Sequence, residues 1–228
     1  MSYMWNEFNI KTFPAETIVY RDGVYQPELS TLSESENLSE KYKLPVHIIY
    51  VGKITGENIL NINLTSSKQP VFLSINIENN FPAFLNIFIK NAGKNSEIRG
   101  HIMLKNSSDL SVNIMAEHKN SDTGILLQTK IIGEKNSFSK ISGTAIIDKN
   151  CKNTKSDIRF GGLATDKSAK IVFNPKQRIS SIPEFAEHSA YMFHTSEPQE
   201  TYLRQSGLSG AEVKDTMIEA FVKDFSLF

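Results

Sequence analysis

Short runs of alternating apolar and polar residues, rich in β-branched side chains, fill the chain from residue 45 onward. Such alternation places every second side chain on one face and predicts β-strands. The runs cover residues 46–51, 58–64, 71–77, 84–89, 98–104, 110–115 and 125–132. They recur about every 13 residues, which predicts an all-β body built from many short strands.

Two architectures produce this rhythm: an antiparallel sandwich, or a coil in which each turn contributes two strands over about 26 residues. The connections are mostly polar and four or more residues long, without the Asn-Gly or Asp-Gly pairs of tight hairpins. This favours the coil. In a coil, alternate residues such as Leu60, Ile62 and Leu64 stack on those of neighbouring turns as an apolar column. Periodicity by itself leaves both architectures open.

The residues before these runs have a different pattern. An apolar stretch at 17–20 reaches a turn at Asp22 and Gly23 and resumes at 24–25, which predicts a hairpin. Residues 30–40 are polar and low in complexity, as is typical of a linker. We therefore expect a hairpin-like segment with its linker over 1–44 and the repeating body over 45–175.

Two helices are predicted near the end of the chain, within a helical module over 176–228. Ser196, Pro198 and Gly207 have the positions of a capping residue, a first-turn proline and a terminal glycine. Ser209 and Glu212 then have the spacing of a capping box. The helix that follows, over 211–225, has one apolar face, formed by Val213, Met217, Ala220, Phe221 and Phe225.

Composition and charge exclude several classes of partner. Lys plus Arg and Asp plus Glu both number 25, so the net charge is zero and no broad basic field attracts nucleic acid. The sequence has neither a run of about 18 apolar residues nor a secretory signal. A single cysteine excludes an intramolecular disulfide and fits a reducing compartment. We expect a cytoplasmic protein that binds neither nucleic acid nor membrane.

Few residues point to catalytic chemistry. Cys151 lies in a polar, turn-like stretch between Lys149 and Lys152, and nearby lysines lower the pKa of a thiol, but an incidental thiol is the favoured interpretation. The sequence has no Gly-rich phosphate loop, no His-Glu-x-x-His pair and no Gly-x-Ser-x-Gly elbow. This speaks against an independent ATPase, metalloprotease or serine hydrolase.

Three stretches, which begin at Ile18, Pro45 and Pro175, together resemble the SufB/SufD family of iron–sulfur cluster assembly proteins, in a shortened form of its SufD-like branch. The first, 18–30, contains Gly23 and ends in Pro-Glu-Leu-Ser at 27–30. The second, 45–51, is similar to the strand that enters the family's right-handed parallel β-helix. The third is similar to the closing segment of the family and contains Pro175, His188-Ser189-Ala190, Tyr202-Leu203-Arg204 and Gly207-Leu208.

The resemblance implies both a fold and a function. The fold is a right-handed parallel β-helix with a small C-terminal α-helical module. The function is that of a non-catalytic scaffold subunit, which docks a SufC-like ATPase and pairs with a SufB-like subunit or as a homodimer. An iron–sulfur cluster is then bound transiently at a shared interface, and none is bound by this chain alone.

The resemblance also implies site residues. His188 matches the family histidine implicated in cluster formation, and Glu187 supplies a carboxylate beside it; imidazole is a competent iron ligand. The competing interpretation is structural, with both residues near the start of a helix. The partner-binding residues implied for the C-terminal module are Tyr202, Leu203, Gly207, Met217, Phe221 and Phe225. The alternative for the apolar helix residues is that they cap the end of the β-helix.

Two other functions remain as alternatives. A β-helical enzyme acting on polysaccharide needs acidic residues converging on one face, and Asp148 with Asp157 is the suggestive pair. The other alternative is a docking-only assembly factor without cluster chemistry.

Overall fold

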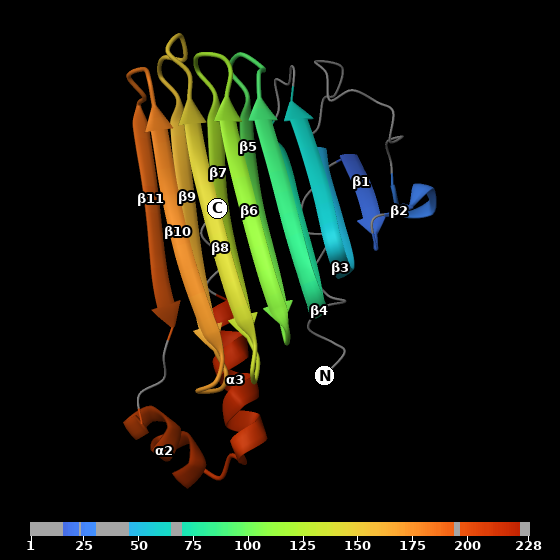
Figure 1. Ribbon diagram of the computed structural model, residues 1–228, viewed down its shortest axis with the longest axis vertical. Helices are drawn as coiled ribbons and strands as arrows, with labels where there is room; N and C mark the ends of the chain where they lie inside the picture. The colour runs from blue at the N-terminus through green and yellow to red at the C-terminus, as the bar shows by residue number, and fades with distance from the viewer. Residues whose placement is uncertain (1–15, 23, 31–45, 65–69, 194–196, 224–228) are drawn as a thin grey trace.

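The computed structural model describes residues 16–22, 24–30, 46–64, 70–193 and 197–223. Two long strands, β3 (Val46–Leu64) and β4 (Val71–Asn91), are followed by strands of nine or ten residues. These are β5 (Glu97–Asn106), β6 (Asp109–His118), β7 (Gly124–Gly133), β8 (Phe138–Ile147), β9 (Lys155–Ala164), β10 (Lys170–Ile179) and β11 (Phe185–Phe193). Figure 1 shows them stacked side by side, with two helices below.

The strands form a parallel β-helix, as predicted. The first half of β4 pairs with β5 and its second half with β6, so this strand bends from one face of the coil to the other. From there β5, β7, β9 and β11 build one wall, called wall A, while β6, β8 and β10 build wall B. Every pairing among these strands is parallel, which excludes the antiparallel sandwich.

The coils lengthen along the chain. Val46 pairs with Val71, an offset of 25 residues, whereas Gly124 pairs with Lys155, an offset of 31. Side chains alternate inward and outward in register, so Ile98, Ile125 and their neighbours stack between the walls with no exposed surface. The predicted apolar column is thus the core, and its burial is the main stabilising contribution to the fold.

The N-terminal hairpin is present and adds a strand to wall A. β1 (Glu16–Arg21) pairs antiparallel with β2 (Val24–Tyr25), as predicted. β1 also pairs in parallel with β3, which the sequence pattern did not indicate. A 3₁₀ turn, η1 (Pro27–Leu29), follows, and Ser30 Oγ accepts a hydrogen bond of 2.9 Å from the amide of Val19. The Pro-Glu-Leu-Ser motif therefore closes onto β1. The predicted linker lies mostly outside the described residues.

Two helices follow β11, as predicted. They are α2 (Glu197–Gln205) and α3 (Gly210–Lys223), and they lie beyond one end of the β-helix (Figure 1). Gly207 has a φ of 96°, the left-handed conformation that ends a helix and that glycine adopts without strain. The capping box forms, because Ser209 Oγ accepts from the amide of Glu212 while Glu212 Oε2 accepts from the amide of Ser209. No described helix is long and apolar enough to cross a membrane.

The boundary expected at residue 175 does not coincide with a change of secondary structure. β10 continues through Ile179, and 185–193 form a further strand of wall A. Residues 176–193 therefore belong to the β-helix, and helical structure begins at Glu197. The pattern was misread because these last strands bury few of their side chains and so lack a clean apolar alternation.

Candidate functional site

The last coil of the β-helix is open. Within the described residues β10 pairs with β8 alone and β11 with β9 alone, so one edge of each strand has no strand beside it. Such an edge presents a row of backbone N–H and C=O groups to which another chain can add a strand. The open coil therefore offers two strand edges to which another chain can add.

His188 lies on the inward row of this open coil. Its register partner on β9 is Ile158, a buried core residue, so the imidazole leaves β11 towards the coil interior. The imidazole is nevertheless exposed, because β11 is the last strand of wall A. The prediction that His188 and Glu187 lie near a helix start is wrong, since both belong to β11.

The inward rows of β10 and β11 carry apolar side chains together with Gln177 and His188. Phe173 of β10 stacks on Phe160 with the ring centroids 5.7 Å apart. A Cβ at Gly162 would lie 2.6 Å from Met192 Sδ and 3.0 Å from Phe173 Cζ, so both side chains close over this glycine. On the inward row of β10, Ile179 is 40% exposed. Partly exposed apolar side chains at the open end of a β-helix suit an interface that a partner covers.

Glu187 points away from His188, because neighbouring residues of a strand face opposite sides. It is in register with Asp157 of β9, whose Oδ2 lies 2.6 Å from Arg159 Nη2. The bond to Asp157, and secondarily the charges of Asp157 and Glu187, raise the pKa of Arg159. Within this chain Glu187 therefore belongs to a charged cluster on the outer face, and the two candidate ligands are not brought together.

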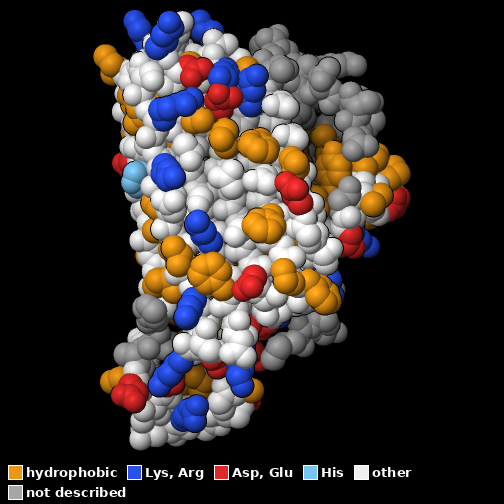
Figure 2. All heavy atoms as spheres, viewed as in Figure 1, with side chains coloured by type: hydrophobic (Ala, Val, Ile, Leu, Met, Phe, Trp, Pro, Cys, Tyr) orange, Lys and Arg blue, Asp and Glu red, His pale blue; other side chains and the backbone are white. Residues whose placement is uncertain are grey.

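The outward charges differ between the two open edges. β10 carries exposed Lys170, Lys176 and Arg178 on its outer face, whereas β11 carries exposed Glu187 beside Asp157. Figure 2 shows basic side chains along the β10 side of the molecule. The outer row of β10 thus carries three exposed cations, whereas that of β11 carries one exposed carboxylate beside the Asp157–Arg159 pair.

Helix α3 packs on the outer face of wall A. Ile218 and Phe221 contact Met103, Ile132 and Leu163, one residue from each of three successive strands. Phe221 is thus buried against the outer face of wall A in this chain. Met217 is half-buried beside it, and Phe225 lies outside the described residues.

An apolar groove of about 420 Å³ lies between α2, α3 and the end of β11. It contains three residues of the predicted partner surface, Tyr202, Leu203 and Met217, and Tyr202 is 69% exposed. Gly207 ends α2 next to it. The groove is lined almost wholly by carbon and is completed by Phe193, Pro198, Gln199, Thr216 and Ala220. These properties are those of a docking surface for an apolar segment.

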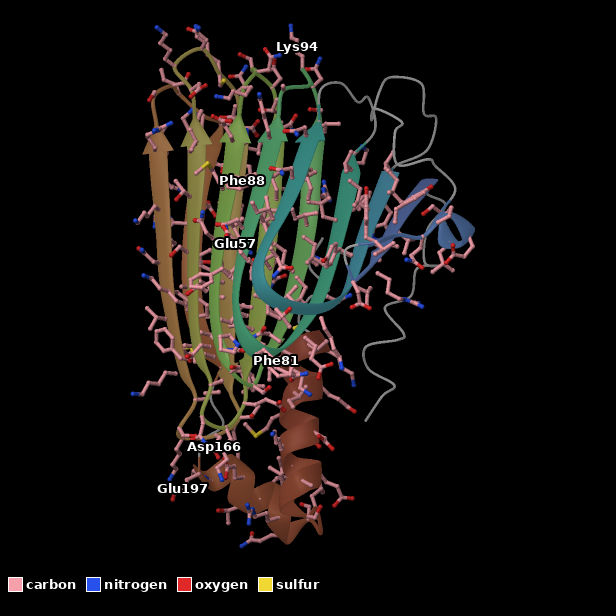
Figure 3. All side chains as sticks on the ribbon, turned by 45° about the vertical axis from the view of Figure 1, so that its right-hand side comes forward. Glu57, Phe81, Phe88, Lys94, Asp166 and Glu197 are labelled. Atoms are coloured by element: carbon pink, nitrogen blue, oxygen red, sulfur yellow. The ribbon has the colours of Figure 1, made fainter. Side chains whose placement is uncertain are left out.

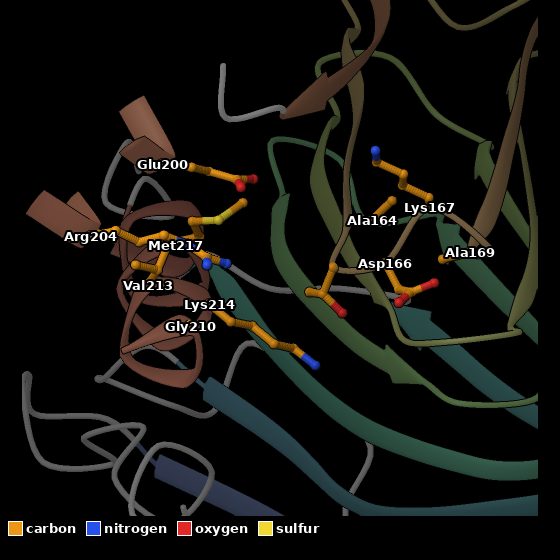
Figure 4. Close-up of a pocket in the computed structure, with 11 residues that line it drawn as sticks. Ala164, Asp166, Lys167, Ala169, Glu200, Arg204, Gly210, Val213, Lys214 and Met217 are labelled. Carbon is orange, nitrogen blue, oxygen red and sulfur yellow. The ribbon is translucent and has the colours of Figure 1, made fainter. Parts of the chain in front are cut away.

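A second, larger cavity of about 590 Å³ separates the helical module from the β9–β10 turn (Figure 4). Charged residues of both signs line it, with Asp166 and Lys167 on the turn facing Glu200, Arg204 and Lys214 on the helices. Figure 3 places Asp166 and Glu197 together at this end and Lys94 at the opposite end. The helices thus contact the β-helix mainly through the Phe221 side of α3.

Cys151 is buried, not exposed in a polar turn. Its thiol donates a hydrogen bond of 3.3 Å to the carbonyl of His118, and burial, reinforced by the Asp148 charge, raises its pKa. The expectation that lysines lower this pKa is therefore wrong. Among the described residues, no three His, Cys, Asp or Glu side chains group as ligands of a metal ion.

The acidic pair considered for a polysaccharide-acting enzyme is divided between the walls. Asp148 follows β8 and lies 2.9 Å from Lys119 Nζ, while Asp157 lies on β9 and pairs with Arg159. Each carboxylate thus has its own cation. This arrangement does not provide the two converging acids that glycoside hydrolysis needs.

These features define a β-helical assembly protein with an open last coil and an appended helical module. The model of the family "SUF system FeS cluster assembly, SufBD core domain" matches residues 78–221, well over half of the chain. The chain therefore belongs to the SufBD family of iron–sulfur cluster assembly proteins, as its sequence resemblance indicated. No individual curated protein matches it.

Proposed function

We propose that this chain is a SufD-like, non-catalytic scaffold subunit of an iron–sulfur cluster assembly complex. The observation that carries the proposal is the open last coil: among the described residues β10 and β11 each have one edge without a neighbouring strand, and His188 is exposed on the inward row of β11. A SufB-like subunit, or a second copy of this chain, adds its own edge strands there. The cluster is cargo, held transiently at the shared interface with His188 as the ligand or proton carrier from this side.

A SufC-like ATPase docks at the groove between α2 and α3. Two features support this assignment: the apolar lining of the groove and the high exposure of Tyr202. Of β11, the groove includes only the last residue, Phe193, so docking there leaves the edge of β10 and most of β11 accessible to the other partner. Nucleotide-driven movement of the ATPase then acts on the scaffold at a distance from the cluster site.

The test is reconstitution with SufB-like and SufC-like partners, comparing wild type with His188→Ala. We expect the variant to assemble normally but to accumulate cluster, followed by its visible absorption, at least about tenfold more slowly. Ser189→Ala is the matched control, because Ser189 is exposed on the same strand and faces outward. Unchanged cluster formation in His188→Ala would leave a docking-only factor, and failure of wild type to bind either partner would refute the scaffold role.

A further inference from the structure

Positive charge is concentrated in the last coils of the β-helix. Residues 135–178 contain ten Lys or Arg residues against three Asp or Glu residues, although the whole chain has 25 of each kind. Residues 179–228, in contrast, contain three Lys or Arg residues against eight Asp or Glu residues. The chain is therefore neutral only on average, with a basic region followed by an acidic one. Such a separation of charge creates a local field that attracts a partner of opposite sign.

Much of the positive charge lies on one flat surface, the outer face of β8 and β10. Ile141 of β8 belongs to the core, so its neighbour Lys140 points outward. The register of β10 with β8 places Lys170, Lys176 and Arg178 on the same outer face. All four side chains are exposed. Lys140, Lys170, Lys176 and Arg178 are called the basic face below.

The basic face is not neutralised by ion pairs. Among the described residues, no ion pair involves any of its four cations. The outward cations of the first coils on wall A are paired, Arg99 with Glu97 and both Lys53 and Lys105 with Glu78. A surface that serves stability alone intersperses charges of both signs, because like charges repel and destabilise the fold. The basic face therefore has the charge pattern of a surface that a partner neutralises.

The three acidic residues of the basic region are engaged elsewhere. Asp148 lies 2.9 Å from Lys119 Nζ, and Asp157 lies on wall A beside Arg159. Asp166, in the β9–β10 turn, accepts hydrogen bonds from the backbone and a side chain of its own turn. None of these carboxylates is on the outer face of β8 or β10. The field of the basic face is thus not compensated locally.

Apolar side chains lie between the cations of the basic face. Phe138 is in register with Lys170 and is 40% exposed, while Val172 is in register with Lys140 and is 45% exposed. A surface that combines exposed apolar side chains with unpaired cations suits a folded protein, whose interface contains both kinds of group. The span is also that of a compact partner. Lys170 and Arg178 are eight residues apart on one strand, which is about 26 Å.

The acidic helical module disfavours an extended polyanion. The module lies beyond one end of the β-helix (Figure 1), and it shares a cavity with the turn that precedes β10. A nucleic acid strand or an anionic membrane reaches beyond the basic face and is repelled at this end by the module, where Glu197, Glu212 and Glu219 are exposed. A compact acidic surface avoids that repulsion.

We propose that the basic face binds an acidic surface of a protein partner. The basic face is separate from the groove between α2 and α3 and from the inward rows of the open coil, so the inference does not rest on the proposed function. Complementary charges of this kind guide the encounter and select the partner. The attraction weakens as salt is added, because exposed charges are screened over about 10 Å at 0.1 M ionic strength.

The first experiment titrates the full-length chain with octa-L-glutamate, whose extended length is about that of the basic face. Changes in backbone amide NMR shifts should locate the peptide on β8 and β10. The double variant Lys140→Gln, Lys176→Gln should bind it about tenfold or more weakly, because two of the four cations are removed. The double variant Lys53→Gln, Lys94→Gln is the matched control, since it changes the net charge equally at exposed positions of the first coils. Equal losses of affinity in the two double variants would overturn the proposal.

A second measurement separates partner binding from a structural role of the lysines. Because the cations of the basic face repel one another, the Lys140→Gln, Lys176→Gln variant should have a thermal unfolding midpoint equal to that of wild type or higher. A lower midpoint would mean that the two lysines stabilise the fold, and their assignment to a partner would then be wrong.

Two further probes decide the class of partner. Octauridylate should bind wild type about threefold or more weakly than octa-L-glutamate, since its longer backbone reaches the acidic module. Vesicles that contain phosphatidylserine should not sediment with the protein at 0.1 M salt. Tighter binding of octauridylate at the basic face would refute the proposal in favour of a nucleic acid. Sedimentation with the vesicles that is lost in the Lys140→Gln, Lys176→Gln variant would refute it in favour of a membrane.

Discussion

The side-chain amide of Asn79 donates a hydrogen bond of 2.8 Å to Oδ1 of Asn106, its register partner one coil further on. Both residues are fully buried at the corner where wall A turns towards wall B. Asn106 Nδ2 in turn donates to the carbonyls of Ser108 and Phe138 and to Ser139 Oγ, so one side chain links three coils. The corner amides thus replace backbone pairing where the strands end.

Replacing Asn106 with alanine should therefore destabilise the fold strongly. The substitution leaves several buried polar groups without partners, and we expect a loss of about 3 kcal/mol in the free energy of unfolding, measured in denaturant. Asn113→Ala is the control, because Asn113 is half-buried and donates one long bond of 3.5 Å to Asn86. The control should lose less than about 0.5 kcal/mol. Equal losses of unfolding free energy in the two variants would show that the hydrogen bonds of the corner asparagines have no special role.

The features that the sequence predicted are those with a strict local period. Alternation at Leu60, Ile62 and Leu64 defined strands, and the Ser209–Glu212 spacing defined the start of α3, because each signal depends on residues a few positions apart. The corner asparagines carried no such signal. Asn79 and Asn106 are 27 residues apart, and their contact depends on the length of the coil between them.

The sequence named His188 as a candidate residue but did not predict the strand that carries it. The family resemblance pointed to His188. Exposed side chains on an edge strand lack the alternation that marks a strand, so the sequence pattern assigns the residues of β11 to the helical module. The contact between Lys130 and Phe221 was not predicted, for another reason. Lys130 lies on β7 at a position whose pattern is typical of an outward-facing residue. No neighbouring residue indicates that a helix 91 residues further along the chain covers it.

Acidification should destabilise the protein through its buried histidines. Burial lowers the pKa of His118 from 6.5 to about 4, and its Nδ1 lies 2.9 Å from Thr123 Oγ1. Between these two values the unfolded chain binds a proton that the folded chain does not, so the free energy of unfolding falls as pH falls from about 6.5 to 4, by roughly 3 kcal/mol in total for this group. Above pH 6.5 this contribution is constant.

Substituting His118 with asparagine isolates that contribution. Asn91 occupies the equivalent corner position one coil earlier, so an amide fits the corner. We expect His118→Asn to have a shallower dependence of unfolding free energy on pH between 4 and 6.5. His101 should account for much of the dependence that remains. Burial and the charges of Lys130 and His47 likewise lower its pKa to about 4. An unchanged slope in His118→Asn would contradict this assignment.

The capping box should control the first turn of α3 alone. Hydrogen bonds from the backbone and side chain of Ser209 lower the pKa of Glu212. The contribution of this carboxylate to the cap is therefore fully present at pH values above the usual carboxyl pKa. It is lost as the pH falls through the lowered pKa. Ser209→Ala should accelerate amide exchange in that turn roughly three- to tenfold and leave the turn at Phe221 unchanged. Ser206→Ala, which removes an exposed bond to the Tyr202 carbonyl, is the control. Loss of protection along the whole helix would mean that the capping box, and not the contacts of Phe221 with wall A, keeps α3 in place.

Blocking the open coil should prevent assembly without unfolding the chain. Ile179 lies on the inward row of β10 and is 40% exposed, so Ile179→Lys places a charge on the surface that a partner's strand must cover. We expect the affinity for a SufB-like subunit, or for a second copy, to fall at least tenfold in sedimentation experiments, because burying an unpaired ammonium is strongly unfavourable. Ile59→Lys is the matched control, since Ile59 is 59% exposed on β3 at the opposite end of the β-helix. Equal loss of affinity in both variants, with the thermal unfolding midpoint unchanged, would place the assembly surface elsewhere than at β10 and β11.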